Sequence, residues 1–246
     1  MNDRIVFGIR PVDELVRARP REVSVVYVAD GTRSPEIERL VQTAKERGVT
    51  VEFRPRQLVA DLAGDTVHQG VVAIAGQFRY VTVNDILKAA TQAGESPLLV
   101  LLDGITDPHN LGAIVRSAEV LGAHGVVIPA HRAAPVTAGA VKASAGATER
   151  MRIAEVINLL KAIDGLRAGG VRVLGAGAAS GQRLDSVDLR GPTALVVGAE
   201  GKGMREAVAR RCDGLFHIPQ RGVVSSLNAS VAAAIALYEA ARQRQT

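Results

Sequence analysis

Residues 98–129 read LLVLLDGITDPHNLGAIVRSAEVLGAHGVVIP, and this stretch decides the fold class. Its first five residues are apolar without interruption, which is typical of a strand buried on both faces of a parallel sheet. After a polar loop, apolar residues recur at helical spacing and predict a helix over residues 111–121. A second apolar run at residues 125–128 predicts the next strand. The expected buried stripe of the helix consists of Leu111, Ile114, Ala118 and Leu121.

Similar short apolar runs occur further along the chain, at residues 171–174, 194–197 and 215–218, and helical patterns separate most of them. Short apolar strands that alternate with helices indicate an α/β fold whose parallel sheet is covered on both faces. A last apolar helix is expected over residues 229–242. In such sheets ligands bind at the carboxyl ends of the strands, and the unusual residues of this chain collect there.

The first 96 residues predict a smaller α/β unit. Gly94-Glu95-Ser96-Pro97 interrupts the pattern before the strand at residue 98 and is typical of a linker. We therefore expect a small domain over residues 1–78, a linker over residues 79–96 and a second domain over residues 97–246. The strands expected in the first part are residues 23–29, 49–53 and 70–75, and the helices are residues 35–47, 56–62 and 85–93.

The net charge of +5 is distributed in a way that suits a nucleic-acid partner. Residues 1–96 balance 13 basic against 13 acidic residues, whereas the remaining 150 residues carry 17 against 12. Arginine, whose planar fork suits phosphate, accounts for 25 of the 30 basic residues, although an arginine bias also reflects genome composition. With seven aromatic residues and no Trp, a platform that stacks single-stranded RNA bases is not expected.

Several classes of protein are disfavoured by what the sequence lacks. The single cysteine, Cys212, excludes an internal disulfide framework and a cysteine-based zinc site, and the five histidines show no metal-ligand spacing. No apolar stretch approaches the roughly 18 residues of a membrane span, and MNDRIVFGIRP does not resemble a signal peptide. We therefore expect a cytoplasmic protein without a metal. A hydrolase with a G-x-S-x-G elbow has no support either.

Three loops carry the candidate functional residues, and the first is DGITDPHN at residues 103–110. Asn110 has the position of an N-cap for the helix that follows. Arg116 lies on the side of that helix opposite the buried stripe, so a rigid helix would hold it near the end of the strand. Spacing alone also allows a solvated Arg116 and an Asn110 that only caps the helix.

The second loop, GAEGKGM at residues 198–204, follows an expected strand. Its three glycines let backbone groups approach a ligand closely, and Glu200 is a possible ligand for a hydroxyl or an amine. The order G-x-x-G-x-G is neither a Walker loop nor the dinucleotide fingerprint. A tight structural turn is the alternative.

The third loop, IPQRGVVSSLN at residues 218–228, precedes the last helix. Ser225, Ser226 and Asn228 are polar residues between an apolar strand and an apolar helix, where the helix N-terminus favours anions and hydrogen-bond acceptors. Helix capping is the alternative role. The helix itself carries an apolar stripe that belongs either to the core or to a subunit interface, formed by Val231, Ala234, Ile235 and Tyr238.

A fourth segment, VRVLGAGAASG at residues 171–181, resembles the start of a nucleotide-binding turn. The dinucleotide fingerprint needs glycine where Ser180 stands, and the sequence QRLDSVDLRG that follows has poor helical periodicity. A nicotinamide-dependent dehydrogenase is therefore disfavoured.

Together, three segments resemble the signature motifs of the SpoU (TrmH) family of RNA 2′-O-methyltransferases. They are residues 103–129, LVVGAEGKGM at residues 195–204 and IPQRGVVSSLNASVAAAIALYE at residues 218–239, in the family's order. FGIRPVDELVRARP at residues 7–20 and HQGVVAIAG at residues 68–76 resemble the ribosomal-protein-like substrate-binding domain of many members. This layout is similar to that of a bacterial enzyme that methylates a guanosine ribose of 23S ribosomal RNA.

The resemblance implies a SPOUT catalytic domain with a parallel sheet and a C-terminal trefoil knot. It also implies S-adenosyl-L-methionine as cofactor, 23S ribosomal RNA or an assembling large subunit as partner, and a homodimer with active sites at the subunit interface. In the family, backbone groups of the motifs hold the cofactor, and here these positions are Gly177, Gly198, Ile218 and Leu227. The polar catalytic residues carried over are Asn110, Arg116, Glu200, Ser226 and Asn228.

The family assigns the residue at Arg116 to activation of the ribose hydroxyl. Because arginine scarcely loses its proton in proteins, anchoring a phosphate and guiding the ribose is chemically easier, and the two roles overlap. The resemblance implies that Asn110 and Ser226 orient Arg116 or the substrate, and that Glu200 and Asn228 shape the cofactor loops. Where the third motif often reads IPM and SLNVSVA, this chain has Gln220-Arg221 and Ala229, which replace no polar catalytic position.

Three alternatives stay open at this point. Two keep the chemistry: a tRNA ribose 2′-O-methyltransferase and an antibiotic-resistance methyltransferase that acts on ribosomal RNA. The third is a non-catalytic RNA-binding or ribosome-assembly protein on the same fold, and the intact set of polar motif residues argues against it.

Overall fold

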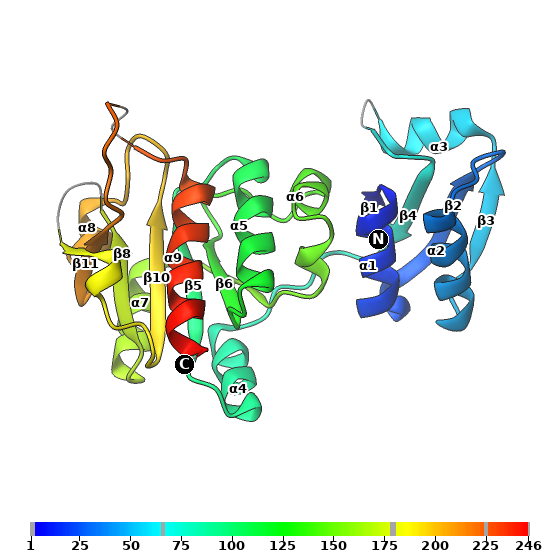
Figure 1. Ribbon diagram of the computed structural model, residues 1–246. Coiled ribbons are helices and arrows are strands. Elements are labelled where there is room, and N and C mark those ends of the chain that lie inside the picture. The colour runs from blue at the N-terminus through cyan, green and yellow to red at the C-terminus, as the bar shows by residue number, and fades with distance from the viewer. Residues whose placement is uncertain (1–2, 65–66, 178–180, 224–225, 246) are drawn as a thin grey trace. The chain divides into compact units, whose positions relative to one another are not determined.

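The computed structural model describes residues 3–64, 67–177, 181–223 and 226–245. The chain forms two compact units, which we call the N-terminal unit and the C-terminal unit (Figure 1). The N-terminal unit comprises Met1–Arg79 with Val136–Arg150, and the C-terminal unit comprises Tyr80–Pro135 with Met151–Thr246. Two residues named above, Ser180 and Ser225, lie outside the described residues.

The units depart from the expected division in two places. The expected linker, residues 79–96, contains α4 (Val83–Ala93), which begins with a capping box formed by Thr82 and Asp85. Ile86 of this helix is fully buried in the core of the C-terminal unit. The second departure is the segment Val136–Arg150, which belongs to the N-terminal unit although both of its ends continue into the C-terminal unit.

A buried ion pair fastens this segment within the N-terminal unit. The side chain of Glu149 is fully buried, and its two carboxylate oxygens accept hydrogen bonds from Arg4 Nη1 and Nη2 at 2.7 and 2.8 Å. Arg19 Nε donates to the Glu149 carbonyl at 3.1 Å. The Phe78 ring centroid lies 5.4 Å from the guanidinium carbon of Arg4 and 5.0 Å from that of Arg19. Bidentate pairs between an arginine and a carboxylate are strong contacts. No pattern in the sequence indicates the Arg4–Glu149 pair.

The N-terminal unit contains a mixed four-stranded sheet in the order β1-β4-β2-β3. β2 and β3 are parallel, and the other two pairs are antiparallel. Residues of α1, α2 and α6 share one apolar core with the sheet, and residues of α3 share another. The elements are β1 (Arg4–Phe7), α1 (Ile9–Ala18), β2 (Val23–Ala29), α2 (Pro35–Glu46), β3 (Val51–Arg54), α3 (Arg56–Ala63), β4 (Val71–Ala75) and α6 (Ala138–Ala143), with 3₁₀ turns at Pro20–Glu22 and Ala147–Glu149.

The C-terminal unit contains a seven-stranded sheet in the order β7-β6-β5-β10-β8-β11-β9. Every neighbouring pair is parallel, which confirms the expected sheet type. The elements are β5 (Leu98–Asp103), α5 (Pro108–Val120), β6 (Gly125–Pro129), β7 (Ile153–Val156), α7 (Leu159–Ala168), β8 (Arg172–Ala176), β9 (Gln182–Arg183), β10 (Thr193–Gly198), α8 (Glu206–Ala209), β11 (Gly214–His217) and α9 (Ala229–Arg244), with a 3₁₀ turn at Leu184–Ser186.

Helices cover both faces of this sheet. Residues of α4, α7 and α8 pack on one face, in a core that includes Leu99 and Leu101 of β5. Side chains alternate along a strand, so the buried Leu98, Val100 and Leu102 point to the other face. There α9 packs against β10 and lies beside α5 (Figure 1). Among the described residues, no helix is long and apolar enough to cross a membrane.

The buried face of α9 differs from the apolar stripe that stands out in its sequence. Small residues form most of that face, which lets the helix lie close to the sheet. The stripe, in contrast, is not core: Val231 is 45% and Tyr238 61% exposed, beside α5. The buried residues of the helix are Ala229, Ala233, Ala236, Leu237 and Ala240.

Candidate active site

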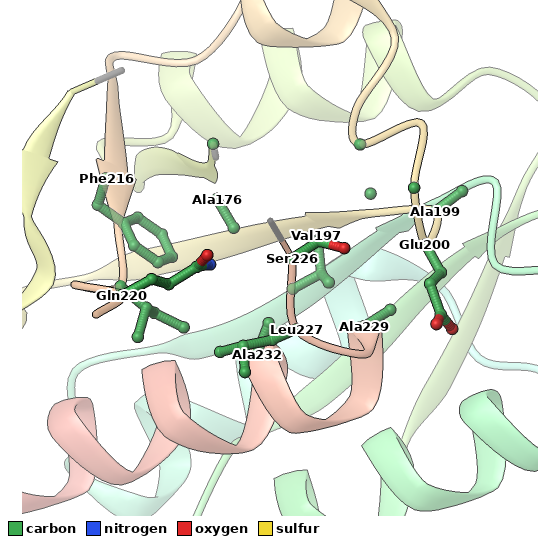
Figure 2. Close-up of a pocket in the computed structure, with 15 residues that line it drawn as sticks. Ala176, Val197, Ala199, Glu200, Phe216, Gln220, Ser226, Leu227, Ala229 and Ala232 are labelled. Atoms are coloured by element: carbon green, nitrogen blue, oxygen red, sulfur yellow. The ribbon is translucent and has the colours of Figure 1, made fainter. Parts of the chain in front are cut away.

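A pocket opens at the carboxyl ends of β8, β10 and β11, the edge at which ligands bind in parallel sheets. Its open space amounts to about 670 Å³, including the mouth. Figure 2 shows Phe216, Leu227 and Gln220 around one end and Glu200 at the other. The four residues expected to hold a cofactor all line this pocket: Gly177, Gly198, Ile218 and Leu227.

The loop after β10 folds back on itself and forms one wall of the pocket. Ala199 and Gly203 exchange backbone hydrogen bonds of 3.1 and 2.8 Å. A Cβ atom on Gly198 would lie 2.2 Å from the carbonyl carbon of Gly203 and from the amide nitrogen of Met204. Glycine is therefore required at this position because the loop closes over it. The motif is thus a tight structural turn that also lines the pocket, and its contact with a ligand stays a prediction.

A buried acid at the end of β5 anchors the same loop. Asp103 is 2% exposed, and its carboxylate accepts hydrogen bonds from the backbone N–H and from Nε of Arg205 at 2.8 and 2.7 Å. The contact ties the first motif to the end of the second. Asp103 is not among the functional residues expected from the sequence. Its signal there is a carboxylate directly after an apolar strand, since buried carboxylates are almost always paired.

Asn228 joins the three motif loops. Its Nδ2 donates to Asn110 Oδ1 at 3.0 Å and to Glu200 Oε2 at 2.9 Å. Its Oδ1 accepts the backbone N–H and the hydroxyl of Ser230 at 2.9 and 2.6 Å, so the residue also caps α9. Because the backbone N–H of Ser230 can only donate, the end of the Asn228 side chain that faces Ser230 must be the amide oxygen. The structure thus brings together three of the expected polar residues, and Asn228 both caps α9 and bonds the other two.

Asn110 is not the N-cap of α5, contrary to the sequence expectation. The helix begins earlier, at Pro108, and Asp107 is its N-cap, with Oδ1 accepting the His109 N–H at 2.9 Å. Proline suits the first helical position because it has no N–H to satisfy, and Asp is a strong cap. The Asn110 side chain in the first turn is consequently available to bond Asn228.

Arg116 lies apart from this cluster. It is exposed and sits on the side of α5 opposite the buried residues, as the periodicity predicts. It does not line the pocket of its own chain, and no hydrogen bond or ion pair engages it within the part of the chain that the structure describes. Ser226, in contrast, lines the pocket. Gln220 also lines it, and Figure 2 shows its side chain pointing inward below Phe216.

The pocket suits binding and positioning of a ligand. Most of its lining is apolar, and the polar side chains that line it are Glu200, Gln220 and Ser226. Cys212 is no nucleophile for it, because burial raises the pKa of this thiol to about 11 and leaves little thiolate at neutral pH. Among the described residues, no group of three or more His, Cys, Asp or Glu could hold a metal ion.

Two family models match the chain in sequence. Residues 97–238 match the SpoU rRNA Methylase family. Residues 5–81 match the family described as RNA 2'-O ribose methyltransferase substrate binding.

Individual proteins resemble the chain over its whole length. The 23S rRNA (guanosine-2'-O-)-methyltransferase RlmB of Photobacterium profundum is 39% identical over 245 residues, which is 100% of both chains. The putative TrmH family tRNA/rRNA methyltransferase YacO of Bacillus subtilis is 38% identical, with 97% of this chain and 95% of the relative covered. The crystal structure of the SpoU methyltransferase AviRb from Streptomyces viridochromogenes with the cofactor AdoMet matches with a TM-score of 0.80 at 29% identity, covering 99% of this chain and 91% of that one.

Proposed function

Since the chain belongs to the SpoU rRNA methylase family and is an S-adenosylmethionine-dependent RNA ribose 2′-O-methyltransferase, we propose that its substrate is a guanosine of 23S ribosomal RNA. The observation that carries this proposal is the full-length match to a 23S rRNA guanosine methyltransferase, which spans the N-terminal unit as well as the pocket. The basic excess of residues 97–246 suits an RNA substrate. A ribosomal RNA substrate would also put the enzyme in the cytoplasm.

The pocket at the sheet edge fits S-adenosylmethionine. Its apolar walls suit a purine ring. The loop of residues 198–204, which we call the glycine loop, brings backbone groups to the pocket surface. We expect backbone groups at Gly177, Gly198, Ile218 and Leu227 to hold the cofactor, which when bound supplies the methyl group on its sulfonium. The Gln220 side chain points into the pocket and adds a hydrogen-bonding amide group to this apolar surface.

The Asn228 network supports catalysis by positioning. Hydrogen bonds from Asn228 tie α5, the glycine loop and the start of α9 to one another. Preorganised supports of this kind keep reacting groups within a fraction of an ångström of the productive geometry. We therefore assign Asn110, Glu200 and Asn228 as positioning residues, and Ser226 as a hydroxyl on the pocket wall that orients the ribose.

Arg116 does not line the pocket of its own chain. It therefore reaches a pocket only if that pocket belongs to a second copy of the chain. Beside Arg116, α5 and α9 form an apolar groove lined in part by Ala113, Leu121 and Ile235. Val120, one helical turn from Arg116, is 71% exposed. Exposed apolar surface of this kind marks an interaction site, and we infer that a twofold contact through this groove forms a homodimer.

In this arrangement Arg116 anchors a phosphate of the target nucleotide. Arginine stays protonated, so its guanidinium stabilises negative charge and orients the ribose rather than taking a proton. Holding the 2′-oxygen in line with the methyl group removes much of the entropic cost of the reaction, and this is where the protein contributes most.

A labelled-methyl assay tests the substrate. The protein is given S-adenosylmethionine labelled on the methyl group together with unmodified 23S ribosomal RNA or unmodified tRNA, and the 2′-O-methyl sites are mapped. Label on a guanosine ribose of 23S RNA is the expected result. Label in tRNA instead would favour the second candidate, which the tRNA/rRNA name of the Bacillus subtilis relative supports. Bound cofactor with no label in either RNA would point to an assembly intermediate as substrate or to a non-catalytic protein.

A mixed dimer tests whether the subunits share Arg116. Arg116→Ala alone should abolish methyl transfer while cofactor binding and dimerisation persist. A dimer of one Arg116→Ala chain and one Gly198→Ala chain keeps one intact pocket, and that pocket faces the wild-type Arg116 of the other chain. Activity restored by mixing two inactive variants supports sharing, whereas a mixed dimer without activity would place Arg116 beside its own pocket.

The C-terminal trefoil knot expected from the family stays a prediction. The strand order supports it, since β10 lies between β5 and β8, so that the chain returns to the middle of the sheet after β8.

A further inference from the structure

A second cavity lies in the N-terminal unit and shares no residue with the active-site pocket. Its open space amounts to about 1140 Å³, including the mouth. Its walls come from the end of β1, the starts of α1 and α2, the stretch before β4 and the end of α6. Residue 142 on α6 lies outside the matched substrate-binding residues 5–81, so the cavity combines that domain with a segment from the other half of the sequence.

Two cations line this cavity, together with one carboxylate, Glu36, whose charge interacts with that of Arg10. Arg10 and Lys142 are exposed, and within the described part of the chain neither forms an ion pair or a hydrogen bond. Lys142 Nζ lies 5.4 Å from the centroid of the Phe7 ring, so an aromatic face and not a carboxylate holds the ammonium group. Elsewhere in this unit Arg4 and Arg150 are paired with glutamates. The charges of Arg10 and Lys142 therefore remain available to a ligand.

The backbone around the cavity adopts conformations that residues other than glycine rarely take. Gln69 has φ +54° and Ala145 has φ +52°. Gln69 Oε1 accepts the Ile9 N–H at 3.2 Å, which leaves its Nε2 as a donor. The conformation of Ala145 ends α6, with the Gly146 N–H bonding the Val141 carbonyl at 3.0 Å. The Gln69 amide adds a hydrogen-bond donor to the cavity beside the two cations.

We propose that this cavity binds a phosphate group of the RNA substrate between Arg10 and Lys142. The proposal rests on the proposed RNA methyltransferase function and names one contact of the N-terminal unit with that substrate. Most protein–nucleic acid hydrogen bonds go to phosphate and sugar, and such contacts set the register of the complex. Val67, which is 71% exposed at the same cavity, offers an apolar surface to the adjoining nucleoside.

One carboxylate opposes this site. Glu36, in the first turn of α2, also lines the cavity and is exposed. Its negative charge repels a phosphate and limits how tightly a nonspecific polyanion binds. Glu36→Gln should therefore bind RNA more tightly than the wild-type chain, which an anion site requires and a purely structural cavity does not.

The test measures RNA binding and not turnover. An unmodified 23S ribosomal RNA transcript is titrated with the full-length protein at several salt concentrations. Arg10→Gln/Lys142→Gln should raise Kd on the order of tenfold and reduce the slope of log K against log salt by about one, as expected for one lost phosphate contact. Cofactor affinity and kcat at saturating RNA should stay unchanged. Lys142→Arg keeps the charge and should retain wild-type affinity.

The matched control is Lys45→Gln/Arg47→Gln, which removes the same charge at the other end of α2, where both side chains are exposed. Its Kd and salt slope should match those of the wild-type chain. The proposal is overturned if the Arg10→Gln/Lys142→Gln protein, with an unchanged thermal midpoint, binds RNA as the wild type does, or if the control loses as much affinity. Methyl transfer to RNA by the wild-type chain is scored separately, so failure of the enzyme assignment is distinguishable from failure of this site.

Discussion

The replacement of Asn228 by serine separates the two roles of this residue. Serine caps a helix about as well as asparagine, so the bonds to Ser230 at the start of α9 can be kept. Its side chain is too short to reach Asn110 and Glu200, which lie 3.0 and 2.9 Å from Asn228 Nδ2. Asn228→Ser therefore removes the active-site network and leaves the cap in place.

The structure sets the expected magnitudes. The bond to Asn110 is partly buried and neutral, so its loss should cost about 1 kcal/mol of unfolding free energy, while the bond to the exposed Glu200 adds little. Asn228→Ala also removes the cap and should cost about 2 kcal/mol. Methyl transfer should fall on the order of a hundredfold in both variants, because α5 is no longer tied to the glycine loop.

Urea unfolding and single-turnover methyl transfer, measured on both variants, check these values. Similar activity losses with unequal stability losses are the expected pattern. An Asn228→Ser enzyme with wild-type turnover would contradict this role, since the network would then be dispensable. An Asn228→Ala enzyme far less active than Asn228→Ser would refute it too, because capping would then be the functional role.

Three other predictions follow from buried contacts. Gly198→Ala should weaken S-adenosylmethionine binding in equilibrium dialysis, because the added Cβ would lie 2.2 Å from backbone atoms, whereas Gly191→Ala, with nothing within 4 Å of its added Cβ and no positive φ, should leave it unchanged. Glu149→Gln removes the charge that pairs with the partly buried guanidinium of Arg4 and should cost about 3 kcal/mol in urea unfolding; a loss near zero would mean that the pair does not stabilise the fold. Burial lowers the pKa of His124, whose Nδ1 accepts the Leu98 N–H at 3.1 Å. The neutral ring is thus favoured on folding, and the free energy of unfolding should decline as pH falls below about 6.5, where unfolded histidine takes up its proton. His124→Asn should flatten that decline, and equal pH profiles would argue against the assignment.

Local features of this protein follow from the sequence alone. The strands β2, β5, β6 and β10 lie where apolar runs predict them, within one residue at each end. Arg116 lies on the predicted side of α5, and the motif set identifies the family. These features depend on neighbours within a turn or two, because strand burial and helix periodicity are set by residues close in sequence.

Tertiary structure decides the features that join distant residues. Asn110 is a partner of Asn228 and not a cap, because Asp107 and Pro108 start the helix first. The Asp103–Arg205 contact and the membership of residues 136–150 in the N-terminal unit have no local pattern either. Each depends on which surfaces meet when the sheets assemble. A side chain's partner more than a hundred residues away is selected by packing and by the need to pair buried polar groups, so it emerges only in the folded chain.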